Sequence, residues 1–412
     1  HTFQDSVRLS LENTRATDAM AVAAAFQTAW SSLGPDQQFK VRSQAKQMKK
    51  KRYKLIPHLV NYYGAIASAI SIENTDGDRL NNYLAVAGKV IEKDNITQAN
   101  IFFQQSRNFF EHHSLNVEKF FQLNVKDDDY QFDYLEPVSV SDTVQTFEEQ
   151  PTDTSWYNAP QWQQPIVQPE LFGPVISFTK LSLDFITPYD TVALTNTKGV
   201  FSLRDKFFEG DGGRFDWSTA GLSSDSVYYD LNKYNFKTTQ PVLKAEQGRL
   251  TYVGKLATNV AGVFEFRSIN HKTKKAATYP RFKSYESNIA LLGLGSDKLK
   301  YKGGFGLQGR AINSNSADGN LATIEIYGDT DKKFKATAAS FGFQDSVIVS
   351  AQAHITIYQQ NDSIVHPAME LRYDYKNQKL VLNKEKSQLR KAPFSSSYFD
   401  VEFTADRINW DL

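Results

Sequence analysis

The sequence of 412 residues contains no cysteine. This absence excludes disulfide bonds, thiolate metal sites and cysteine nucleophiles together, although it does not by itself indicate a compartment. No apolar run approaches the roughly 20 residues that a membrane-spanning helix needs. The chain begins with His1 and continues with polar residues, so no hydrophobic signal segment stands at this end. Two interpretations of His1 stay open, cleavage of an export signal or a trimmed chain.

An excess of either charge is also missing, because 47 basic and 46 acidic residues leave a net charge of +1. Bulk electrostatics therefore gives no argument for nucleic acid or an anionic membrane, and only a local patch could supply one. The content of hydrophobic residues is 41% and that of aromatic residues 13%, which is enough to build packed cores. A chain of this length is typical of two or three domains.

Residues 1–125 show the spacing of amphipathic helices. An alanine-rich stretch from Asp18 ends at Gly34-Pro35, and Asp36 begins a second segment that runs to about Lys51. Three further helices are predicted after Pro57, from Asp78 and from Thr97, the second with an apolar stripe at helical spacing. Five or six helices with short connections predict a helical bundle.

Residues 126–170 differ sharply in composition. Within 127–170 there are ten acidic residues, five prolines and no lysine or arginine. Such a segment is expected to be an extended, self-repelling linker. Trp156, Tyr157 and Trp162 are unusual in a linker, and we expect them either to dock on a flanking domain or to contact a partner.

Residues 171–412 show the period-two alternation of strands with one buried face. Phe264 and Phe266 alternate with polar residues, and so do Ile324 and Ile326. Further examples of the same alternation are Ile355 with Ile357, and Leu371 with Tyr373 and Tyr375. We therefore predict an α+β multidomain protein, a helical bundle followed by a mainly antiparallel β-domain shaped as a trough, a jellyroll or an irregular solenoid.

The phrases SAQAHITIY and LRYDYKNQKLVL, within residues 333–412, have a cadence that resembles the OstA-type β-jellyroll repeat of lipopolysaccharide-transport proteins. The resemblance implies an open sheet with an apolar groove lined by the inward-facing strand residues. The whole chain also resembles long, uncharacterised envelope proteins of gliding-type Gram-negative bacteria. That likeness implies an exported protein of the periplasm or cell surface, and the β-domain would continue in a longer parent chain.

Two clusters of charged residues are candidate sites. The glycine-rich segment 207–217 carries Glu209, Asp211 and Asp216, an oxygen-rich set that suits calcium. The full EF-hand spacing is absent, and a tight hairpin or bulge explains the segment better. The run 46–54, with Lys49, Lys50, Lys51 and Arg52 at its centre, could face a membrane, nucleic acid or an acidic segment. Asp127, Asp128 and Asp129 are the acidic segment of the chain itself that could lie against this run. A solvated helix end is the alternative.

No catalytic motif is present, neither a G-x-S-x-G elbow nor an H-E-x-x-H helix. The sequence predicts a non-catalytic envelope scaffold or adaptor without a cofactor, whose partner is another envelope protein, a lipid or a glycan, and not nucleic acid. The alternative is a carbohydrate-binding or carbohydrate-active protein that uses Trp156, Trp162 and Trp217 as stacking platforms. That alternative requires Trp217 to be exposed.

Overall fold

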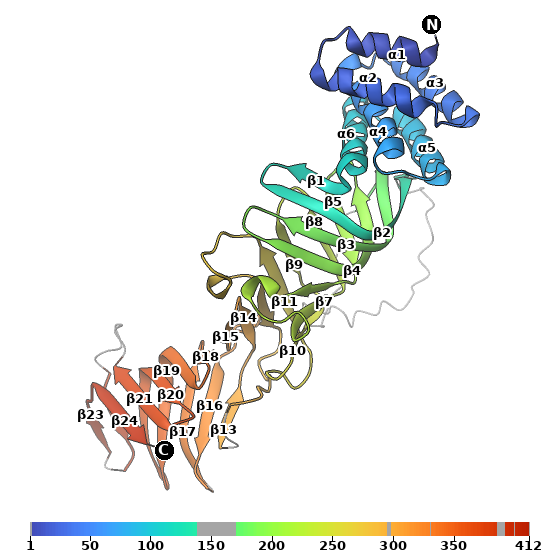
Figure 1. Ribbon diagram of the computed structural model, residues 1–412. Coiled ribbons are helices and arrows are strands. Elements are labelled where there is room, and N and C mark those ends of the chain that lie inside the picture. Colours follow the sequence, from blue (N-terminus) through green and yellow to red (C-terminus); the bar gives the residue numbers. More distant parts are fainter. Residues whose placement is uncertain are drawn as a thin grey trace, which may run out of the picture. The chain divides into compact units, whose positions relative to one another are not determined.

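The computed structural model describes residues 2–137, 170–294, 298–329, 331–384, 392–398 and 400–411. Helices come first along the chain and strands follow, and in Figure 1 the helices are the blue ribbons at the N-terminal end. The described residues form two compact units. The first unit holds the residues up to Arg214 together with Asn232–Val242, and the second holds Phe215–Leu231 and the residues from Leu243 onward.

Six α-helices form the N-terminal region, as the sequence predicted. They are α1 (Phe3–Glu12), α2 (Thr17–Trp30), α3 (Pro35–Lys50), α4 (Val60–Ser71), α5 (Gly77–Lys93) and α6 (Ile96–His112), with a π-helical turn, η1 (Leu55–Leu59), before α4. The two longest have side-chain caps: Asp76 accepts the amide of Arg79 at 2.8 Å, and Asn95 accepts that of Gln98 at 2.9 Å. No helix among the described residues has the length and apolar character to span a bilayer.

The strands that follow the helices pair antiparallel and do not close into a barrel. The first eleven are β1 (Ser114–Glu118), β2 (Phe121–Leu135), β3 (Gly173–Ile186), β4 (Thr191–Ser202), β5 (Phe207–Asp211), β6 (Arg214–Asp216), β7 (Val227–Leu231), β8 (Lys233–Lys237), β9 (Val242–Ala245), β10 (Gly248–Tyr252) and β11 (Val260–Arg267). The others are β12 (Arg281–Ser284), β13 (Leu299–Lys302), β14 (Gly306–Gln308), β15 (Ala311–Asn313), β16 (Ala322–Tyr327), β17 (Lys332–Ala338), β18 (Gly342–Gln344), β19 (Val347–Gln359), β20 (Asp362–Asp374), β21 (Lys379–Lys384), β22 (Phe394–Ser396), β23 (Val401–Phe403) and β24 (Arg407–Asp411).

The boundary between the helices and the sheet differs from the prediction. Helix α6 ends at His112, so residues 114–125 are strands and not part of a helical domain. Residues 126–135, predicted to begin the linker, instead complete β2, which pairs with β3 over its length. Asp127, Asp129 and Asp133 are exposed there, whereas Tyr130, Phe132 and Tyr134 are buried. The period-two alternation, and not the acidic composition, therefore determined that this segment is a strand. Residues 138–169, the rest of the predicted linker, lie outside the described residues.

A bulge in β2 explains why this alternation is easily missed. Leu123 and Val125 face the core before the bulge, and Tyr130 and Phe132 face it afterwards, so the inward positions change from odd to even numbers. The register with β3 shifts between Lys126 and Tyr130. One extra residue in a strand reverses which side chains face the core.

The first unit has a core that helices and sheet share. The ring of Phe132 on β2 lies 5.2 Å from that of Tyr83 on α5 and 5.5 Å from that of Phe110 on α6, measured between centroids. Phe132, Tyr83 and Phe110 are all at most 1% exposed. Helices α5 and α6 therefore pack on this sheet, whereas α1, α2 and α4 pack on other helices.

The second unit is built around the long hairpin β19–β20. Near its turn the hairpin pairs with β17 and β22, and at its other end with β18 and β21. Register shifts between Ser350 and Ile355 separate the two ends of the hairpin. We call each end, together with the strands that pair with it, a branch. Apolar side chains of both branches, Ile324, Phe334, Ile355, Leu371 and Leu382 among them, pack into one buried cluster. The period-two alternation predicted for Phe264, Ile324, Ile355 and Leu371 is confirmed, because all four side chains are buried.

Candidate functional site

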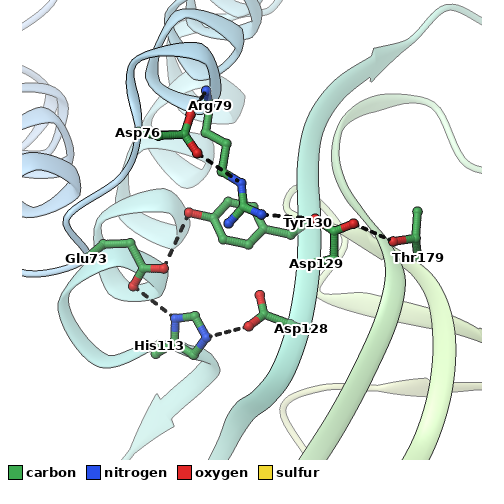
Figure 2. A network of polar contacts seen from close by, with 8 residues as sticks. All are labelled: Glu73, Asp76, Arg79, His113, Asp128, Asp129, Tyr130 and Thr179. Carbon is green, nitrogen blue, oxygen red and sulfur yellow. Dashed lines mark hydrogen bonds and ion pairs between the residues drawn. The ribbon is translucent and has the colours of Figure 1, made fainter.

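A network of charged side chains joins the helices to the first sheet (Figure 2). His113 follows α6 with a left-handed backbone, φ 50°, and its ring lies between two carboxylates. Nδ1 is 2.9 Å from Glu73 and Nε2 is 3.0 Å from Asp128. These contacts, that with Asp128 first, raise the pKa of His113 to about 9, although partial burial of the ring opposes the rise.

The same network continues through Arg79, near the start of α5. Its guanidinium lies 2.9 Å from Asp129 and 4.7 Å from the ring centre of Tyr130. Thr179 on β3 donates to the other oxygen of Asp129 at 2.9 Å. Asp128 and Asp129 thus bind His113 and Arg79, and the prediction that they lie against the basic run 46–54 is wrong. Because each of the two cations lies between two carboxylates, we interpret the network as a structural joint.

Two of the three predicted calcium residues are engaged in other contacts, and Oε1 of Glu209 is buried without a hydrogen-bond partner among the described residues. Asp211 lies 3.2 Å from Lys198, and the carboxylate of Asp216 accepts the amide of Ser218 at 2.8 Å. Glu209 on β5 is half-buried, and this burial raises the pKa of its carboxyl group. In the part of the chain that the structure describes, no three His, Asp or Glu side chains come together in a way that could hold a metal ion. The segment turns through Gly212 and Gly213, both with positive φ.

Of the basic residues predicted to contact a partner, three are exposed and one is bound to another helix. Lys49 and Lys50 are exposed in the last turn of α3, and Arg52 is exposed just beyond it. Lys51 donates to the carbonyl oxygens of Ile91 and Glu92 at 2.6 and 2.7 Å, so it caps the end of α5. Trp156, Tyr157 and Trp162 lie outside the described residues.

Trp217 is fully buried, with 0% of its surface exposed. Its ring lies 5.7 Å from that of Phe264, within the core of the second unit. An indole in this position cannot stack on a sugar, so the requirement of the carbohydrate alternative is not met at this residue. The indole Nε1 also has no hydrogen-bond partner among the described atoms.

The second unit contains a cavity of about 780 Å³ between the two branches of the β19–β20 hairpin. We call it the mouth cavity, and its apolar lining includes Ile326, Tyr327, Ile357, Tyr373, Ile408 and Trp410. Ile326 and Tyr373 belong to the buried cluster, and Ile357, Ile408 and Trp410 pack against it. The lining is therefore a continuation of the core to the surface. Its volume lies in the range of pockets that bind small organic ligands.

The two lysines that line the mouth cavity are each paired with an aspartate, and Asp411 adds a carboxylate to the lining. Lys298 lies 2.7 Å from Asp329, and Lys333 lies 2.9 Å from Asp331. Paired charges of this kind give no strong preference for an anion or a cation. The cavity thus suits an apolar chain better than a charged group.

A second pocket in the same unit is lined by more basic than acidic side chains. It has a volume of about 550 Å³, with Leu222, Leu291, Ile312 and Phe343 among its lining residues. Lys255, Lys275 and Arg310 also line it, together with the single carboxylate of Asp345. We call it the basic groove, because these three cations outnumber the acidic side chains that line it.

No protein-family model matches this chain, and no curated protein or solved structure was found to be similar to it. The resemblance to OstA-type repeats and to envelope proteins therefore stays a prediction.

The sequence predicted which face of a strand several mouth-cavity residues lie on, but it did not predict that these residues line one cavity. Ile326, Ile357 and Tyr373 were each assigned to a buried face from period-two alternation. Trp410 was not singled out, although it alternates with Ile408 in the last strand. His113 was not predicted as a site residue, because nothing near it in the sequence identifies Glu73 and Asp128 as its partners.

Proposed function

We propose that this protein is a non-catalytic component of a bacterial cell envelope, exported to the periplasm or the cell surface, whose second unit contacts lipid. The observation that carries the proposal is the mouth cavity, an opening in the core lined by Ile357, Tyr373 and Trp410. Apolar surface left accessible at such an opening gains free energy when an acyl chain covers it, at about 25 cal/mol per Å². The resemblance of residues 333–412 to the OstA-type repeat of lipopolysaccharide-transport proteins is consistent with the same role.

The binding of an apolar probe tests the proposal. The full chain is titrated with the neutral dye N-phenyl-1-naphthylamine, whose fluorescence rises in apolar surroundings, and then with a single-chain lipid as competitor. We expect the dye to bind and the lipid to displace it. A chain that binds neither would remove the lipid-contacting role.

A matched pair of variants locates the binding. Ile357→Gln places an amide in the mouth cavity, whereas Val365→Gln changes a half-buried residue on the neighbouring strand that does not line the cavity. We expect Ile357→Gln to weaken dye binding by about tenfold, a cost of roughly 1.4 kcal/mol, and Val365→Gln to leave it within about twofold. Equal losses in both variants would place the dye elsewhere. Cell fractionation that recovers the protein in the cytoplasm would contradict the envelope assignment.

A further inference from the structure

Helix α3 has an outer face that is basic and partly apolar. Phe39, Arg42, Lys46, Lys49 and Lys50 recur at intervals of three or four residues and are all exposed, so they share one face of the helix. Val41, Gln44 and Met48 are buried on the opposite face. The Gln44 amide donates to the carbonyl oxygen of Leu84 on α5 at 2.6 Å, which holds the helix in place and the cations outward.

The charge of this face is not balanced by the rest of the described chain. Residues 37–72 contain eight lysine and arginine residues and no aspartate or glutamate. Among the residues that the structure covers, Lys46, Lys49 and Lys50 form no ion pair, in contrast to Arg79, Lys93 and Arg107, which do. Asp128 and Asp129 are bound in the network of Figure 2 and do not neutralise the face.

Exposed apolar side chains stand at both ends of this basic stretch. Phe39, in the second turn of α3, is 72% exposed, more than any other large hydrophobic residue in the described parts. Ile56, just after Lys54, is 45% exposed. An acidic protein or a nucleic acid backbone would need the cations alone, whereas a bilayer interface accepts both cations and an inserted aromatic ring.

We propose that the outer face of α3 binds the surface of an anionic lipid bilayer, with Phe39 inserted between head groups. The cations attract the anionic lipids, and each contributes about a fivefold increase in the partition coefficient. The convex face of a helix about 24 Å long contacts a flat surface along its length. This inference rests on the first unit alone and does not depend on the mouth cavity.

The test is sedimentation of the full chain with vesicles of phosphatidylcholine, with and without phosphatidylglycerol. We expect binding only to the vesicles that contain phosphatidylglycerol, and we expect it to weaken as the salt concentration rises. Substituting Lys46, Lys49 and Lys50 together by Gln should weaken binding by about a hundredfold, from three factors of about five. Glutamine matches lysine in helix propensity, and circular dichroism verifies the fold of the variant.

Matched variants distinguish this surface from general electrostatic attraction. Lys237, Lys272 and Lys376 are exposed lysines elsewhere in the chain, and their joint change to Gln alters the net charge equally. We expect that control to bind vesicles within about twofold of the unchanged chain. A control as weak as the α3 variant, or no preference for phosphatidylglycerol, would overturn the proposal.

Phe39→Ser separates a membrane from an acidic macromolecule. It should weaken vesicle binding by about tenfold and leave binding to heparin unchanged, because only the bilayer offers an apolar interior to the ring. Binding to heparin without binding to vesicles would show that the partner is a soluble polyanion, and the membrane proposal would be wrong. Ile357→Gln should bind vesicles normally, so failure of the mouth cavity and failure of this surface give different results.

Discussion

His113 owes its charge to two carboxylates that come from distant parts of the chain. Glu73 lies 40 residues before it and Asp128 lies 15 residues after it, and their side chains are only 15% and 11% exposed. Hydrogen bonds from a partly buried imidazolium to carboxylates favour the protonated form. A histidine next to a helix end thus becomes a fixed cation at neutral pH.

The raised pKa of His113 makes the stability of the helical region depend on pH. Its folded pKa of about 9 lies above the unfolded value of 6.5, so the contribution is complete below about pH 6.5 and is lost as the pH rises through 9. Since the side chain is 33% exposed, screening reduces the effect, and we expect roughly 1–2 kcal/mol. Urea unfolding followed by circular dichroism at 222 nm, which reports the helices, measures it.

Two asparagine variants check the assignment to His113. His113→Asn removes the ring but tolerates the left-handed backbone, and it should abolish the loss of stability between pH 6.5 and 9. His112→Asn changes the exposed neighbour and should retain that loss. The same pH dependence in both variants would show that another group is responsible.

Strand β2 is the element on which the first unit depends most. Phe132, on the buried face of β2, packs against aromatic rings of α5 and α6. The bulge at Asp127–Asp129 places the carboxylates of Asp128 and Asp129 next to His113 and Arg79. The left-handed backbone of Asp127, φ 48°, is typical of such a bulge. A single strand thereby supplies both the apolar and the ionic contacts with the helices.

Truncation of Phe132 tests this role of β2. Phe132→Ala leaves a cavity among rings that are at most 1% exposed, and we expect a loss of about 3–4 kcal/mol in the free energy of unfolding. Gln131→Ala, the adjacent exposed position, should change stability by less than about 0.5 kcal/mol. Thermal or urea unfolding compares the two. A loss below about 1 kcal/mol for Phe132→Ala would mean that the shared core contributes little.

At the scale of the whole chain, the helices and the first sheet belong to one compact unit. Strands β2 and β3 pair at twelve positions from Gln122 to Leu135, although residues 136–172 separate the two strands along the chain. The chain is therefore not a helical domain and a β-domain that only a linker connects. Cutting between these strands would leave β2 paired only with β1 and β3 paired only with β4, with one open edge on each.

Separate expression of residues 1–137 and 170–412 tests this organisation. Each fragment alone should aggregate or give broad unfolding, because an edge of unpaired backbone and an apolar face become exposed. Co-expression should yield a soluble complex with the two fragments in equal amounts on size-exclusion chromatography. A monomeric 1–137 fragment with a sharp thermal transition would contradict the shared core.

Local patterns in the sequence determined the type and order of the elements. Apolar spacing predicted the helices around Leu84 and Phe109, and alternation predicted the buried faces of Phe264 and Ile355, because these periods are properties of helix and strand geometry. Tertiary structure alone decided the bulge that turns Asp128 toward His113, the burial of Trp217 and the meeting of Ile357 with Trp410 at one cavity. Period and composition specify which face of an element is apolar, but only packing between distant segments decides what that face meets.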